Sequence, residues 1–189
     1  MSGASEAVAA PLAPEQLVSA LFADPGLRVY GMVLGSRMGD LPDRLAQADG
    51  LDFHCLIPGA LSPTLRMRAP YLVQLRADSP FSRWLLLEAA AGFADWGVVA
   101  RSGARMLELR SHARDLRSAV DPEGRTFRLD WMDPVVLDII LSAAAPDQLE
   151  AIFARLESLT VTAPRRWSEY RLHAGRLQRR AVDVMVKAS

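Results

Sequence analysis

Short apolar segments with strand composition alternate with helical segments along residues 14–162, and this alternation restricts the fold more than any other feature. Residues 28–34, 71–75 and 96–100 are rich in apolar residues and are bounded by glycine or proline, as in buried strands. Residues 80–91 follow a serine and carry a helical apolar pattern that begins with proline. Alternating helices and strands usually form one sheet with helices on its faces. We therefore predict a single α/β domain with a mixed, largely parallel sheet flanked by helices.

The sequence changes character after Pro164. Apolar residues then recur at helical spacing on an arginine-rich background: Trp167, Tyr170, Ala174, Leu177, Ala181 and Val184. This spacing predicts an amphipathic, basic helix at the C-terminus. The predicted organisation is a flexible N-terminus (1–13), an α/β domain (14–163) and the C-terminal amphipathic helix (164–189).

Charge, cysteine content and hydropathy argue against several kinds of partner and cellular location. The chain has 22 basic and 22 acidic residues, so no net field attracts it to nucleic acid or to an anionic membrane. Its single cysteine, Cys55, cannot form an internal disulfide. Residues 1–14 lack the basic start and apolar stretch of a signal peptide, and no segment has the ~18 uninterrupted apolar residues of a membrane span. We expect a cytoplasmic protein that neither binds nucleic acid nor inserts into a membrane.

The residues that carry chemistry are scattered. Three histidines and one cysteine show no metal-ligand spacing, and Gly31 and Gly35 lack the further residues of a phosphate-binding loop, so we expect no metal and no cofactor. His54 and Cys55 are neighbours in a predicted strand, which directs their side chains to opposite faces. One enzymatic alternative remains, a pocket that gathers His112 with Asp130 and Asp133. Asp133 is better explained as the N-cap of the helix that begins at Pro134.

A predicted helix over residues 104–119 carries arginines on one side. Arg110, Arg114 and Arg117 share this face, opposite an apolar stripe. Such a basic face is most often solvated, and the second interpretation is a surface that meets an acidic protein partner.

Several short motifs occur in a fixed order along the chain. They are Pro70-Tyr71-Leu72, Trp84-Leu85-Leu86, Trp96-Gly97, Ser111-His112-Ala113-Arg114, and Asp133-Pro134 with Leu137. Together they resemble the effector-chaperone, or adaptor, family of bacterial type VI secretion, which was first catalogued as a domain of unknown function. The family usually has an arginine three residues before the aspartate and another directly after the proline. Here these places hold Asp130 and Val135, and Arg128 is the candidate to replace the first arginine.

The resemblance implies a function in protein recognition. Members of the family bind a toxic effector in the donor cytoplasm and help to load it onto the spike protein, without catalysis and without a cofactor. For this chain we predict an effector-binding surface on the C-terminal segment with a second patch on the basic helix: Trp167, Tyr170, Leu177 and Val184, with Arg110 and Arg114. The alternative is that the C-terminal segment packs against its own sheet. The rival functions are a small α/β enzyme and an immunity-type or regulatory binding module.

Overall fold

The structure is a computed structural model that describes residues 10–93, 95–120 and 123–185. Most of the predicted flexible N-terminus, residues 1–9, lies outside the described residues. Residues 10–13 lead into the first helix. Leu12 forms an isolated parallel bridge with Val184 and so ties the beginning of the described chain to its end.

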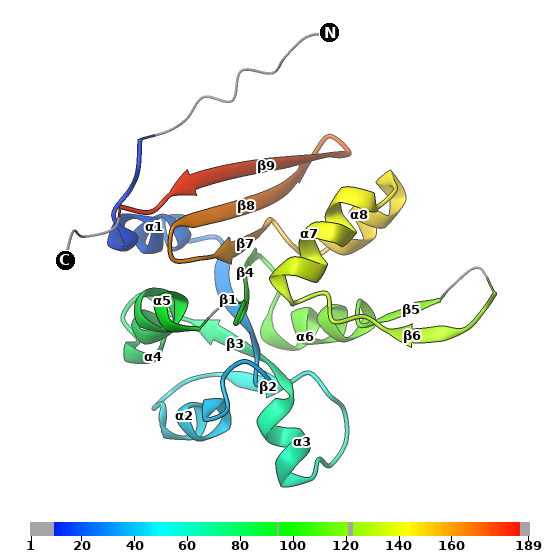
Figure 1. The fold of residues 1–189 in the computed structure, drawn as a ribbon, viewed down its shortest axis with the longest axis horizontal. Coiled ribbons are helices and arrows are strands. Elements are labelled where there is room, and N and C mark those ends of the chain that lie inside the picture. Colours follow the sequence, from blue (N-terminus) through cyan, green and yellow to red (C-terminus); the bar gives the residue numbers. More distant parts are fainter. Residues whose placement is uncertain (1–9, 94, 121–122, 186–189) are drawn as a thin grey trace, which may run out of the picture.

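Seven strands in the described part of the chain form one sheet, in the order β2-β3-β1-β4-β7-β8-β9 (Figure 1). Their bounds are β1 Arg28–Leu34, β2 Phe53–Cys55, β3 Pro70–Leu75, β4 Gly97–Ser102, β7 Ser158–Thr162, β8 Arg166–His173 and β9 Arg176–Asp183. Each neighbouring pair in this sheet is antiparallel. The prediction of a largely parallel sheet is therefore wrong.

The connections between strands explain this error. Both β3 and β4 are antiparallel to β1, so they run in the same direction, and a helical segment joins them as in a parallel crossover. The same holds for β1 and β2, which flank β3. In both cases a strand of opposite direction fills the place between the two crossover strands. Local patterns of helix and strand do not reveal that insertion.

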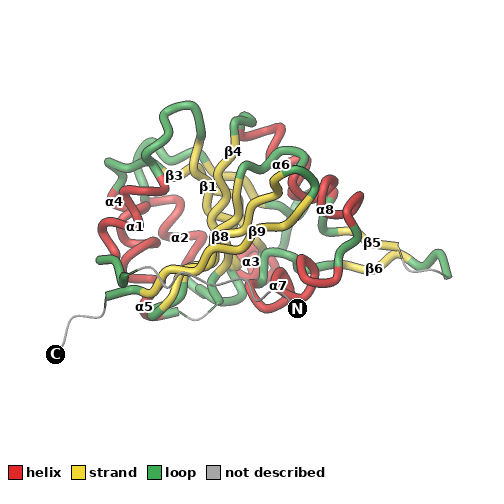
Figure 2. The backbone as a smooth tube through the Cα atoms, turned by 90° about the horizontal axis from the view of Figure 1, so that it is seen from above, coloured by secondary structure: helices red, strands yellow, loops and turns green. Residues whose placement is uncertain are grey.

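Helices cover both faces of the sheet, so the domain has three layers (Figure 2). Side chains of β1 alternate between them: Val29 and Val33 pack in one core cluster, and Tyr30 and Met32 in the other. The first face carries α1 Pro14–Leu21, α2 Leu41–Gln47 and the continuous segment of α4 Pro80–Arg83, the π-helical turn η1 Trp84–Ala89 and α5 Ala90–Gly92. The second face carries α6 Met106–Asp115, α7 Pro134–Ala143 and α8 Pro146–Phe153.

Two elements extend from this body. The short helix α3 Pro63–Arg68 precedes β3, and its residues are exposed. A hairpin of β5 Ser118–Val120 and β6 Thr126–Arg128 follows α6 and projects away from the sheet (Figure 1). The basic helix predicted over residues 104–119 therefore ends earlier, and its last part belongs to the hairpin.

The predicted C-terminal amphipathic helix is also wrong, because residues 166–183 form the antiparallel hairpin β8–β9, called here the tail hairpin. His173 pairs with Arg176, and the two residues between them, Ala174 and Gly175, both have positive φ angles (48° and 71°). Positive φ at both central residues is the geometry of a two-residue turn that matches the twist of paired strands. This turn, and not the helical spacing of the apolar residues, determines the local structure.

Candidate docking surface

The tail hairpin buries Trp167 and Tyr170, the aromatic residues predicted to bind the effector, which is the client protein of the adaptor. Trp167 is 6% exposed and Tyr170 is 3% exposed, and they lie in the core clusters on opposite faces of the sheet. Leu177 and Val184 are half-buried and pack against the same clusters. That these side chains form a binding surface stays a prediction, which their burial does not favour. The geometry matches the alternative, in which the segment packs against its own sheet.

Several polar groups of the tail hairpin have partners within the fold. The hydroxyl of Tyr170 donates to Asp138 Oδ1 on α7 at 2.7 Å, and the Arg179 guanidinium lies 5.5 Å from the Tyr170 ring centroid. Burial and this hydrogen bond raise the pKa of Tyr170 to about 12. Arg166 binds Asp183 at 2.7 Å and Arg171 binds Glu169 at 3.0 Å.

The predicted arginine face of α6 packs against the edge of the sheet instead of facing solvent. Arg114 Nη2 donates to the carbonyl of Cys55 at 2.8 Å, and Arg110 Nη1 lies 3.4 Å from His54 Nδ1. Both arginines are half-buried and connect α6 to β2. Their contacts are structural, and a role of Arg110 and Arg114 in partner binding stays a prediction.

Arg117, the third arginine of that face, is buried with few partners. It follows the end of α6, and only 7% of it is exposed. Nη2 lies 3.3 Å from Asp130 Oδ1, whose side chain is 63% exposed. Nε and Nη1 are buried, and within the described residues they have no hydrogen-bond partner. Burial and the nearby charge of Arg128 lower the pKa of Arg117.

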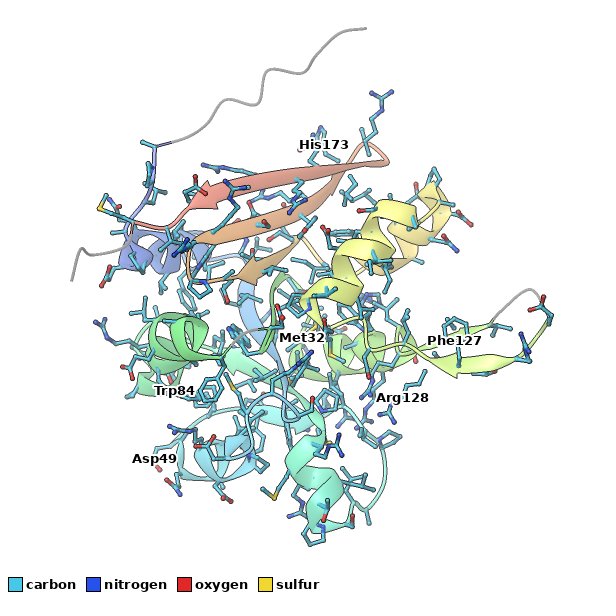
Figure 3. The ribbon with its side chains drawn as sticks, in the orientation of Figure 1. Met32, Asp49, Trp84, Phe127, Arg128 and His173 are labelled. Carbon is cyan, nitrogen blue, oxygen red and sulfur yellow. The ribbon has the colours of Figure 1, made fainter. Side chains whose placement is uncertain are left out.

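Arg117 lines a cavity of about 520 Å³ beyond the ends of β1 and β6 and beside α3. Three more arginines line it, namely Arg37, Arg68 and Arg128. We call this cavity the arginine pocket. Figure 3 shows Arg128 at the base of the β5–β6 hairpin. The remaining lining is acidic, hydroxyl or apolar: Asp130, Asp133, Ser36, Leu34, Ile57, Leu65 and Pro70. Four arginines against two aspartates give the pocket a positive balance.

Both carboxylate oxygens of Asp133, at the edge of the pocket, accept hydrogen bonds. Its Oδ1 accepts from the backbone N–H of Val135 at 3.0 Å and of Val136 at 3.4 Å, which confirms the predicted N-cap of α7. Its Oδ2 accepts from Arg37 Nη2 at 2.8 Å, and this hydrogen bond raises the pKa of Arg37. The aspartate is thus a structural anchor that also fixes one arginine of the pocket.

The residues of the enzymatic alternative do not meet in this pocket. His112 Nε2 lies 2.9 Å from the carbonyl oxygen of Ile152, a contact that links α6 to α8, and His112 does not line the cavity that Asp130 and Asp133 share. No cluster of three or more potential metal ligands occurs among the residues that the structure describes.

Exposed apolar side chains lie on the elements around the arginine pocket. Leu65 and Met67 on α3 are about half exposed, as is Phe127 on β6 (Figure 3). Val135 and Ile139 face solvent on α7. The sequence reasoning missed α3 as a helix, although Ser62 before Pro63 was an available N-cap signal. It also missed the pocket, because the four arginines come from separate segments.

Comparison with known proteins identifies the family. A family described as a domain of unknown function, DUF4123, matches residues 29–151, which is more than half of the chain. The chain belongs to the DUF4123 family. The DUF4123 match runs from β1 into α8, so it includes every residue that lines the arginine pocket and ends before the tail hairpin. No curated protein and no solved structure matches the chain.

The structure also bears on membrane association. None of the helices in residues 10–93, 95–120 and 123–185 combines the length and the apolar character that are needed to cross a bilayer.

Proposed function

We propose that this protein is an adaptor that binds a type VI secretion effector in the cytoplasm and helps to load it onto the spike protein. In this proposal the protein acts by recognition alone, without catalysis, metal or cofactor. The DUF4123 domain is associated with effector adaptors of type VI secretion, and the match covers the ordered motifs from Pro70 to Leu137.

The surface formed by α3, the β5–β6 hairpin and the start of α7 is the observation that carries the proposal. It combines arginines with the exposed side chain of Leu65 and the half-buried side chain of Ile57. Arginine and large apolar residues are enriched at protein interfaces, and a few buried anchors usually supply most of the binding energy. This composition supports a surface that holds another protein.

The gene neighbourhood and coexpression test the proposal, which expects a toxin gene and a spike-protein gene beside this one. We expect the toxin to be soluble and to copurify with the protein, and its loading onto the spike to fail when the gene is deleted. The His112→Ala variant should restore loading in the deletion strain, because the side-chain contact that the structure describes for His112 is a structural one between α6 and α8. Equal toxin solubility and equal loading without the protein would overturn the adaptor function.

The same experiment separates the adaptor from a module of the immunity or regulatory type. An immunity-type module would neutralise the toxin without affecting its loading onto the spike. An adaptor is required for loading even in a strain that is resistant to the toxin. We therefore expect the deletion to abolish loading in a resistant strain as well.

A further inference from the structure

The charge of Arg117 is incompletely balanced within the fold. Burial removes the water that would solvate its guanidinium, and of its three nitrogens only Nη2 has a partner among the described residues. That partner, Asp130, is mostly exposed. A buried polar group without a hydrogen bond is costly, and a buried charge is more so. Such a group persists in a fold more readily when a ligand completes its contacts.

The other charges around Arg117 make an anion the matching ligand. Arg68 and Arg128 are exposed, line the same cavity and form no ion pair with an acidic residue in the described part of the chain, while Asp133 is already occupied by Arg37 and by the N-terminus of α7. Arg128 repels Arg117 and helps to lower its pKa. A carboxylate between them would accept hydrogen bonds from guanidinium groups, which bind planar carboxylates in two-pronged geometry.

The apolar part of the pocket distinguishes a peptide from a free anion. Leu34, Ile57 and Leu65 line the same cavity as the arginines, and Leu65 is 54% exposed at its edge. A volume of about 520 Å³ exceeds what one carboxylate fills. A chain segment with an acidic side chain next to apolar ones would satisfy both parts of the lining.

We propose that the arginine pocket is a receptor for an acidic segment of the client protein, with carboxylates on Arg117, Arg68 and Arg128 and neighbouring apolar side chains on Leu65 and Ile57. This assignment rests on the proposed adaptor function and names the chemistry of its client. An acidic segment is the expected occupant because its charge is complementary to the arginines of the pocket.

Binding of two labelled peptide pools to the purified protein tests the proposal. One pool alternates Asp or Glu with random apolar residues, and the second has Asn or Gln at the same positions. We expect the acidic pool to bind about tenfold more tightly than the amide pool, since charge-assisted hydrogen bonds carry the difference. Arg117→Met and Arg128→Glu should each remove this preference. Arg83→Glu, an exposed arginine on α4, is the matched control and should retain it.

The outcomes separate the pocket from the wider function. Equal binding of both pools, or a preference that survives both pocket variants, overturns the proposal, and circular dichroism of each variant verifies that it is folded. Release of the acidic pool by equimolar inorganic phosphate or succinate would assign the pocket to a free anion and also overturn it. If the pocket variants still copurify the toxin as the wild type does, the adaptor function stands and the pocket assignment fails.

Discussion

The tail hairpin and the arginine pocket are both rich in arginine, but their arginines differ in burial and in the carboxylates that they bind. In the tail hairpin, Arg166 and Arg171 each bind a carboxylate of the same hairpin. In the arginine pocket, Arg117 is more deeply buried and has one exposed partner. The apolar residues differ as well, because Trp167 is enclosed in the core and Leu65 faces solvent.

This difference shows how composition misleads when it is separated from contacts. The tail was the more conspicuous pattern in the sequence, with aromatic and basic residues at regular spacing, and the fold uses that pattern for its own stability. The pocket has no local pattern in the sequence, and there Nε and Nη1 of the buried Arg117 lack a hydrogen-bond partner among the described residues. The family match follows the same division, because it includes the pocket and excludes the tail hairpin.

Truncation of Trp167 gives the largest expected effect on stability. Trp167→Ala should lower the free energy of unfolding by about 3–5 kcal/mol, because it leaves a cavity in a packed core. Phe127→Ala, on the exposed hairpin beside the pocket, should change it by less than about 0.5 kcal/mol. Denaturant unfolding followed by circular dichroism measures both. Similar losses in the two variants would contradict the distinction between a structural tail and an exposed docking surface.

Two buried arginines should respond differently when they are replaced by methionine. Arg117→Met should leave the free energy of unfolding unchanged or raise it by up to about 2 kcal/mol, since an apolar residue removes a poorly compensated buried charge. Arg101 is equally buried, but its Nε donates to Ser158 Oγ at 3.1 Å and it lies 3.8 Å from Glu169 on β8. Arg101→Met should lower the free energy by about 1–3 kcal/mol.

The same denaturant experiment measures this pair, and the informative result is that only Arg101→Met lowers the free energy of unfolding. If Arg117→Met destabilises the protein as much as Arg101→Met does, then Arg117 is a structural residue. The pocket would then lose the feature that distinguishes it from the tail hairpin.

Ionisation of tyrosine gives the smallest effect, because it is absent at neutral pH. Burial is the largest cause that raises the pKa of each of the three tyrosines, Tyr30, Tyr71 and Tyr170, and it raises the pKa of Tyr170 to about 12 together with the hydrogen bond to Asp138. The neutral phenol is favoured in the folded state. The associated stability is therefore fully present below pH 10 and is lost as the pH rises from 10 towards 12.

Ultraviolet titration of tyrosinate measures this effect. The native protein should ionise above pH 10, and the protein in denaturant should ionise near the ordinary value. The Tyr170→Phe variant should lose the latest part of the native titration. If one tyrosine of the native protein ionises near the ordinary pKa, its ring is not enclosed. This result would be most informative for Tyr170 in the tail hairpin.

The sequence predicted the elements whose signals are local. The central strands β1, β3 and β4 occur where apolar runs are bounded by glycine or proline, and Asp133 caps α7 as its position before Pro134 indicated. Gly97 in the Trp96-Gly97 motif also has a local reason. Its φ of 147° and the close approach of the Met32 carbonyl leave no room for a Cβ atom.

The remaining features depend on contacts between distant segments. The direction of β1 between β3 and β4 cannot be read from either neighbour, which is why the sheet was predicted as largely parallel. Trp167 and Tyr170 are three residues apart, a spacing that fits one face of a helix as well as opposite faces of a strand. Arg37, Arg68, Arg117 and Arg128 are separated by tens of residues or by a hairpin, so no pattern in the sequence indicated the arginine pocket.

Affinity for the purified toxin, measured with two charge-reversal pairs, tests most directly whether the arginine pocket holds the client. The Arg68→Glu/Arg128→Glu pair changes exposed arginines of the pocket. The Arg165→Glu/Arg176→Glu pair changes one exposed arginine directly before the tail hairpin and one beside its turn. We expect the first pair to weaken binding by about a hundredfold, as loss of two charge-assisted contacts implies, and the second pair to bind as the wild type does. Full binding by the pocket pair, or a loss confined to the tail pair, would contradict the account.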